Sequence, residues 1–169
     1  YPLRRQRQMC IRDRPYTIPS NWVWVYNKAL TEIIGDGLHG TPNYDSAGEY
    51  YFINGSNLKN LKIEINDETK RVNRIEFEKY KKKLGDSTIF LSINGTLGNI
   101  ALYKDEKIIL GKSVAYLNYN ITEIIPFIIF LLKSPYFKIF CEENYTGSTI
   151  KNIPLSALRN FLVPLPPLE

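Results

Sequence analysis

The residues with the greatest chemical potential lie in one short stretch, GDGLHGTPNYD, at positions 35 to 45. It holds the only histidine of the chain, His39, together with two aspartates, a threonine and a tyrosine. Side chains of these types could serve a catalytic loop, a phosphate-binding loop or a metal site. They could equally form a turn, because Gly, Pro, Asp and Asn dominate turns for conformational reasons. Which of these interpretations is favoured depends on the partner residues that the rest of the chain offers.

The rest of the chain offers few partners for catalysis. A triad or an acid-base pair built on histidine has only His39 to use, and no Gly-x-Ser-x-Gly turn occurs. Two cysteines, Cys10 and Cys141, supply neither a zinc site nor a disulfide framework. The sequence also lacks both glycine-rich nucleotide-binding motifs and the Asn/Asp-Pro-Pro-Tyr/Phe tetrapeptide, which resembles the catalytic motif of adenine methyltransferases. We therefore predict a noncatalytic protein with no cofactor and no metal.

One segment is compatible with nuclease chemistry. Glu68-Thr-Lys70 has the Glu-x-Lys spacing of metal-dependent nucleases, and Asp45 and Asp67 lie upstream. Asp67 is only one position from Glu68, whereas a metal pair needs carboxylates from separate strands that converge. A turn is therefore the favoured interpretation, and a small metal-dependent nuclease is kept as an alternative.

The positive charge of the chain is concentrated at its start. Five of the 22 basic and one of the 17 acidic side chains lie in residues 1 to 14, which leaves 17 basic and 16 acidic side chains for residues 15 to 169. The net charge of +5 thus falls to +1 for the body. With 44% hydrophobic residues, the body is long enough to bury one core. We expect a disordered or non-native tail over residues 1 to 14 and a single domain over residues 15 to 169.

No segment has the length and composition of a membrane span. The most apolar run, IIPFIIFLL at residues 124 to 132, is too short to cross a bilayer and predicts a buried helix. The start of the chain has no apolar core of a secretory signal. We expect a cytoplasmic protein without a membrane partner.

Hydrophobic periodicity predicts an α+β fold. A helix of one or two turns is expected over residues 28 to 34, and a surface helix over 74 to 84 with Glu76 ahead of Lys79 and Glu78 ahead of Lys82. Two helices should follow Thr122, with a break at Ser134, and Ser156 should cap a short helix before a last strand at FLV. Strands are expected over residues 22 to 26, 49 to 53, 62 to 65, 87 to 93, 99 to 103 and 113 to 119.

Five polar segments occur in a recognisable order. They are IPSNWVWV at 18 to 25, DGLHGTPNY at 36 to 44, FINGSNLKN at 52 to 60, STIFLSINGTLGNIALY at 87 to 103 and GSTIKNIPLSALRNFLVPLPPLE at 147 to 169. Together they resemble the target recognition domain of the specificity (S) subunit of Type I restriction-modification enzymes, over nearly everything from Ile18 onward. One departure is Asn94, where the family often places arginine before Gly-Thr, so a base or phosphate contact is less expected there.

The resemblance implies a fold of intertwined short β-strands, a double β-helix-like mixed sheet, with a C-terminal helical hairpin. It implies one target recognition domain, truncated where a spacer helix would begin. In such enzymes each recognition domain reads one half of a bipartite DNA site, while other subunits act on the DNA. The implied partners are double-stranded DNA, adenine methyltransferase (M) subunits and, through the complex, the restriction/translocase (R) subunit. A recognition domain of a single-chain, Type IIG-like restriction-methyltransferase enzyme is the alternative.

Loop residues with donor and acceptor groups are the candidates for contacting DNA, because base edges are read by such groups and phosphates by Lys and Arg. Glycines and Pro42 should hold the first loop outward, and we expect that loop and GSTIKN to lie on one DNA-facing side. For His39 a local hydrogen bond within a structural turn is the alternative. Tyr44, Tyr50 and Tyr51 are considered for stacking on an extruded base, although core packing is the stronger explanation for Tyr51, which alternates with Ile53 along its strand. The candidates are His39, Thr41, Tyr44, Asn94, Thr96, Lys112, Ser148, Thr149, Lys151 and Asn152.

Overall fold

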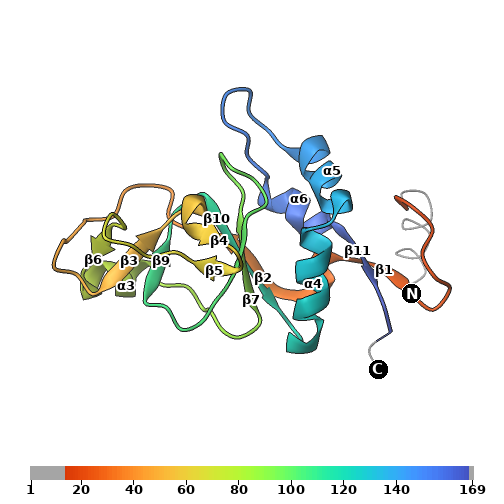
Figure 1. Cartoon of the computed structure of the whole chain (residues 1–169), viewed down its shortest axis with the longest axis horizontal. Coiled ribbons are helices and arrows are strands. Elements are labelled where there is room, and N and C mark those ends of the chain that lie inside the picture. The colour runs from red at the N-terminus through yellow and green to blue at the C-terminus, as the bar shows by residue number, and fades with distance from the viewer. Residues whose placement is uncertain (1–13, 168–169) are drawn as a thin grey trace.

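The computed structural model describes residues 14 to 167. The predicted tail, except for its last residue, lies outside the described residues, as do residues 168 and 169. Figure 1 shows an elongated molecule with a β-rich region at one end and helices towards the other. The first and last described strands, β1 (Val23–Tyr26) and β11 (Leu162–Leu165), pair with each other at the helical end.

The strands are short and the helices are few, as expected for a mixed α+β fold. Between β1 and β11 the strands are β2 (Thr31–Asp36), β3 (Tyr50–Ile53), β4 (Leu58–Lys59), β5 (Lys62–Ile63), β6 (Arg71–Val72), β7 (Thr88–Ser92), β8 (Ile100–Leu102), β9 (Ile108–Leu110) and β10 (Val114–Tyr119). The helices are α2 (Asn27–Leu30), α3 (Arg74–Tyr80), α4 (Ile125–Leu132), α5 (Pro135–Asn144) and α6 (Leu155–Asn160), with 3₁₀ turns η1 (Gly55–Asn57) and η2 (Thr122–Ile124).

A central antiparallel sheet has the strand order β2-β10-β7-β8. A second sheet has the order β6-β3-β9, in which β3 is antiparallel to β6 and parallel to β9. The β4–β5 hairpin and the β1–β11 ribbon complete the sheets of the described residues. The predicted α+β class, with a mixture of parallel and antiparallel strands, is confirmed.

The two inner strands of the central sheet, β7 and β10, are buried on both faces. Ile89 and Leu91 of β7 pack with the helices in one core cluster, whereas Phe90 packs in a second cluster with residues of β3, β5 and β9. Strand β10 divides in the same way, since Leu117 belongs to the helical cluster and Tyr116 to the other. Because both faces of β7 and β10 lack solvent contact, these strands show no alternation of apolar and solvent-exposed residues. The polar residues that they contain, Thr88, Ser92 and Asn118, are themselves buried.

The helical side of the core contains α4 and α5, which follow one another at a sharp break. Pro135 occupies the first turn of α5, and Ser134 caps it by accepting a hydrogen bond from the Phe137 N–H. The two helical segments, Thr122–Leu132 and Pro135–Asn144, are bent by 72°. The predicted pair of helices with a break at Ser134 is confirmed, although the pair forms an elbow and not a closed hairpin.

No single helix in residues 14 to 167 is long and apolar enough to cross a membrane, and only the bent pair α4 and α5, taken together, has the required length and composition.

Three local predictions are wrong. The helix expected over residues 28 to 34 stops at Leu30, because Thr31–Asp36 pairs with β10 as an edge strand of the central sheet. The helix expected over 74 to 84 stops at Tyr80, and the following segment is held by the Asn118 side chain, which donates to the Lys83 carbonyl at 2.7 Å. Ser156 does not cap α6, since it lies inside a helix that starts after Pro154.

The ion pairs on α3 also differ from the expected ones, which joined Glu76 to Lys79 and Glu78 to Lys82. Glu78 pairs with Lys81, and this contact holds the pKa of the Glu78 carboxyl below its usual value. Glu76 is buried and accepts hydrogen bonds from Asn43 in the first loop. The prediction treated both glutamates as solvent-exposed, whereas one of them anchors a loop.

Asn27 provides a test of the helical core. Its buried side chain donates to the Leu158 carbonyl at 3.1 Å and accepts from the Tyr119 hydroxyl at 3.0 Å. Burial raises the pKa of Tyr119, so its hydroxyl stays neutral and donates its proton to the Asn27 side chain. We expect Asn27→Ala to lower the free energy of unfolding by about 2 kcal/mol or more, because two buried polar groups lose their partner.

The measurement is chemical denaturation of the variant beside Asn120→Ala, which removes an exposed side chain. The control should unfold like the wild type. Equal stability of both variants would show that the Asn27 side chain does not hold α2 to the core.

Candidate nucleic-acid interface

The ends of several strands meet at one edge of the molecule. β2 ends where β10 begins, because Asp36 pairs with Ala115. β7 ends at the same edge, because Ser92 pairs with Val114. The parallel strands β3 and β9 also end side by side, and residues 111 to 113 lead from β9 into β10. We call the loops that follow these strand ends the loop rim: residues 37 to 41, 54 to 57, 93 to 99 and 111 to 113.

A fifth segment joins the rim from the helical side. Residues 146 to 152, which contain GSTIKN and are here called the arm, form a closed loop in which the Thr146 N–H donates to the Asn152 carbonyl and the Asn152 N–H donates to the Thr146 carbonyl. Gly147 has φ of +90°, and a Cβ there would lie 2.2 Å from the Ile150 carbonyl oxygen. The arm therefore requires glycine at this position.

The arm is docked on the loop after β7. The Gly95 N–H donates to the Lys151 carbonyl at 3.0 Å, and the Asn94 side-chain amide donates to the Asn152 side-chain oxygen at 3.3 Å. Figure 1 shows the two loops projecting from the same side of the molecule, beside one another. Three residues predicted from sequence, Asn94, Lys151 and Asn152, are thus brought together.

A polar hollow of about 340 Å³ lies within the rim. We call it the rim hollow, and it is lined by Asn54, Gly55, Ser56, Asn94, Thr96, Lys112 and Ser113. Three of these were predicted as contact residues: Asn94, Thr96 and Lys112. Asn54, Ser56 and Ser113 were missed, although the segment FINGSN was already recognised as one of the five polar segments.

The first loop begins on the rim and is anchored at both ends. The Leu38 N–H donates to the Leu110 carbonyl at 2.7 Å. Further along, the Glu76 carboxylate accepts from the backbone N–H of Asn43 at 2.9 Å and from its side-chain amide at 3.2 Å. The exposed His39 ring contacts the Asp36 carboxylate at 2.6 Å, with the tautomer unassigned. The local hydrogen bond considered for His39 is therefore present, and Thr41 is exposed beside it.

The tyrosines considered for base stacking lie away from the rim hollow. Tyr44 is 48% exposed, pairs with Val72 in an isolated bridge and lines another hollow with Lys70 and Arg71. Tyr50 stacks on Phe77 with ring centroids 4.1 Å apart, so its ring is occupied. Tyr51 packs against the second core cluster, as expected from the core-packing explanation for this residue.

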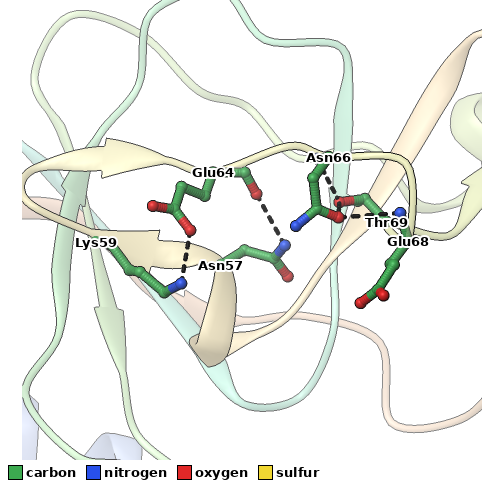
Figure 2. A network of polar contacts seen from close by, with 6 residues as sticks. All are labelled: Asn57, Lys59, Glu64, Asn66, Glu68 and Thr69. Carbon is green, nitrogen blue, oxygen red and sulfur yellow. Dashed lines mark hydrogen bonds and ion pairs between the residues drawn. The ribbon is translucent and has the colours of Figure 1, made fainter.

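The Glu-x-Lys segment forms a turn. The Glu68 N–H donates to the Asn66 side chain at 3.0 Å, and the Thr69 hydroxyl accepts from the Asn66 N–H at 3.0 Å. Figure 2 shows the Glu68 carboxylate directed away from these contacts, and beside them a separate set in which Asn57 donates to the Glu64 carbonyl and Lys59 pairs with the Glu64 carboxylate. In residues 14 to 167 no group of three or more His, Cys, Asp or Glu side chains is placed to hold a metal ion.

The described cysteine, Cys141, lies in the helical core. Burial raises the pKa of its thiol to about 11. The thiol is therefore protonated at neutral pH and is not an activated nucleophile.

These features define a class of protein: a stiff β-rich domain that presents polar loops along one edge. The sequence model of the family "Type I restriction modification DNA specificity domain" matches residues 19–169. The chain belongs to this family.

Solved structures of specificity subunits share the fold. The S subunit of a Type-I restriction-modification system from M. genitalium matches with a TM-score of 0.53 and 22% identity over 89% of this chain and 36% of that chain. The HsdS subunit from Thermoanaerobacter tengcongensis matches with a TM-score of 0.63 and 16% identity over 98% of this chain and 39% of that chain.

A third chain belongs to a structure of complex assembly and conformational transition of the type I R-M system, with a TM-score of 0.59 and 18% identity over 99% of this chain and 40% of that chain. The present chain therefore spans well under half of each of these three structures. No curated protein matches it in sequence.

The buried carboxylate of Glu76 should determine the order of the first loop. We expect Glu76→Ala to cost about 1 to 3 kcal/mol of stability, because the Asn43 donors lose a charged acceptor. Amide hydrogen exchange at Asn43 should become faster, while exchange within β10 changes little.

The matched control is Glu78→Ala on the same helix, which removes an exposed carboxylate paired with Lys81. Its exchange pattern should equal that of the wild type. If Glu76→Ala also leaves exchange at Asn43 unaltered, the carboxylate does not anchor the loop.

The arm should depend on Gly147. We expect Gly147→Ala to cost about 1 kcal/mol or more, because alanine is strained at positive φ and its Cβ meets the Ile150 carbonyl. The loss should be seen as a lower melting temperature and faster amide exchange in residues 146 to 152. Gly85→Ala is the control, since no atom lies within 4 Å of a Cβ there. An unperturbed arm in Gly147→Ala would contradict the described turn.

Proposed function

We propose that this chain is a noncatalytic DNA-reading domain, which recognises one half of a bipartite target site for a Type I restriction-modification complex. The observation that carries the proposal is the loop rim with its docked arm, because it gathers candidate contact residues from distant parts of the sequence in a member of the DNA specificity family. The double β-helix-like description of the strands and a single recognition domain over residues 15 to 169 belong to the same proposal.

The chemistry of the rim suits sequence reading. The polar side chains of the rim and the arm are hydroxyls, amides, an imidazole and two lysines, Lys112 and Lys151. The loops are held by backbone hydrogen bonds to neighbouring strands and to each other. Donors and acceptors on rigid loops can discriminate base edges, whereas lysines contact phosphates and set the register. We assign the first role to His39, Thr41, Ser148 and Thr149.

Asn94 and Asn152 have a different assignment. Because their side chains bond to each other, we propose that they align the arm with the loop after β7 and contribute to recognition through the atoms left free. Tyr44 lies in a separate hollow, so any DNA contact by Tyr44 would be made beyond the rim.

Tight binding should need other subunits. The body of the chain has a net charge of only +1, and phosphate neutralisation supplies most non-specific affinity for DNA. We propose that adenine methyltransferase (M) subunits complete the DNA interface and that the restriction/translocase (R) subunit joins through the assembled complex, in the cytoplasm.

Two alternative functions can be distinguished from the proposed one by experiment. The Type IIG-like alternative requires a catalytic domain fused to this one, and the full reading frame decides it. The nuclease alternative requires metal-dependent cleavage by Asp45, Asp67, Glu68 and Lys70. It is disfavoured because Glu68 lies on a turn with no metal-binding cluster in the described residues.

The arm lysine should contribute affinity without sequence preference. In the subunit assembled with its M partner, we expect Lys151→Ala to weaken binding to all duplexes and to reduce the slope of log K against log salt by about one phosphate contact. Lys138→Ala, which removes an exposed lysine of α5, is the control and should leave the slope unchanged. A changed methylation motif in Lys151→Ala would contradict the assignment to phosphate.

The first loop should contribute sequence preference. We expect His39→Ala or Thr41→Ala to relax one position of the methylated motif, at a cost of about 1 to 3 kcal/mol if a base contact is lost. Sequencing of methylated genomic DNA measures the motif, and thermal melting shows whether the loop still folds. Both variants methylating wild-type sites at wild-type rates would make the loop purely structural.

A further inference from the structure

We infer that the rim hollow binds one phosphate group of the DNA backbone, and that Asn54 and Ser113 are the residues that prepare it for this anion. The inference rests on the proposed function, because it takes DNA to be the ligand of the rim. It adds a separate phosphate-binding position, formed by residues that the base-reading assignment does not use.

The hollow presents hydrogen-bond donors and no carboxylate. Its lining side chains supply the hydroxyls of Ser56 and Thr96 and the ammonium of Lys112, and none of the lining residues is acidic. The Lys112 side chain makes no ion pair within the described residues. A site with one free cation and several neutral donors favours an anion with several acceptor oxygens.

Asn54 is oriented so that its donors remain available. The Gly55 N–H donates to the Ser113 hydroxyl at 2.9 Å, and that hydroxyl donates its own proton to the Asn54 side-chain oxygen at 3.2 Å. No hydrogen bond between described residues uses the Asn54 amide N–H₂ group. The chain of hydrogen bonds therefore fixes the acceptor end of the amide against the protein and leaves its donor end for a ligand.

The backbone leaves space for this arrangement at Gly111. A Cβ at Gly111 would lie 2.2 Å from the Asn54 side-chain oxygen. Any larger residue would displace the amide from its position, so glycine at 111 and serine at 113 act together on Asn54. Both residues come from the connection between β9 and β10, whereas Asn54 follows β3.

The shape of the site distinguishes a phosphate from a base. Base edges are recessed in the grooves and are reached by side chains that protrude. A backbone phosphate protrudes from the duplex and offers oxygens in several directions, so it fits a concave site whose donors converge from separate loops. The rim hollow is concave, and its donors come from the loops after β3, β7 and β9.

A phosphate at this position would set the register of the base-reading loops. Asn94 lines the hollow and also bonds to Asn152 of the arm. The arm and the hollow therefore share one rigid connection, and a phosphate held in the hollow would fix the distance of the arm from the duplex.

The test uses the specificity subunit assembled with its M partner and two short duplexes, one with the motif found by methylation sequencing and one without it. Asn54→Asp keeps the acceptor for Ser113 but replaces the two donors with a negative oxygen, and Lys112→Gln removes the charge. We expect each variant to weaken binding of both duplexes by about tenfold and to reduce the salt slope by about one contact. The methylated motif should stay unchanged.

Two further variants distinguish the positioning of the Asn54 amide from the effect of lysine charge. Ser113→Ala should weaken binding of both duplexes without changing the salt slope, because it frees the Asn54 amide and leaves Lys112 in place. Lys133→Gln removes an exposed lysine at the end of α4 and should bind as the wild type. Thermal melting of every variant checks that each complex contains folded protein.

Several results would overturn the inference. A shifted methylation motif in Asn54→Asp or Lys112→Gln, with an unchanged salt slope, would make the hollow a base-reading site. Wild-type binding by both variants would show that it contacts no DNA. In either case the wild-type complex would still bind its motif, and the proposed function would stand. If the wild-type complex binds neither duplex, the proposed function itself fails.

Discussion

The burial of the inner strands β7 and β10 on both faces is the constraint on which the rest of the structure depends. Strands β7 and β10 insert alternate side chains into two separate core clusters, so a shift of one residue in register would exchange the two sets. The same register places the ends of β2 and β7 at the start of β10. The loop rim therefore follows from core packing, and Ile93 is the rim residue that belongs to the core itself.

The anchors of the loops are largely separate from the side chains that face solvent. Backbone groups of Leu38, Gly95 and Asn152, and the buried carboxylate of Glu76, hold the loops in place, while His39, Thr41 and Thr149 are exposed. Such a division permits exposed residues to change without loss of the fold.

The sequence predicted the positions of strands and helices better than it predicted which strands pair with one another. The segments STIFLSI and SVAYLNY were identified as strands from their hydrophobic and β-branched or aromatic residues, and the break at Ser134 was indicated by the proline that follows it. Thr31–Asp36 was misassigned as helix because its pairing with β10 lies far away in sequence. The order of polar segments identified the family, but the rim hollow could not be predicted, since Asn54, Asn94 and Lys112 meet only through strand register.

Photo-crosslinking of the assembled complex to its target duplex tests the central claim most directly. Reactive bases and reactive phosphates placed throughout the half-site would be crosslinked, and the attached peptides of this domain identified by mass spectrometry. The account predicts crosslinks within the loop rim and the arm, with phosphate probes at residues 54 to 57, at residues 111 to 113 and at Lys151, and with base probes at residues 37 to 41, Ser148 and Thr149. Crosslinks confined to the α4–α5 elbow or to the β6–α3 end, with none on the rim, would contradict it.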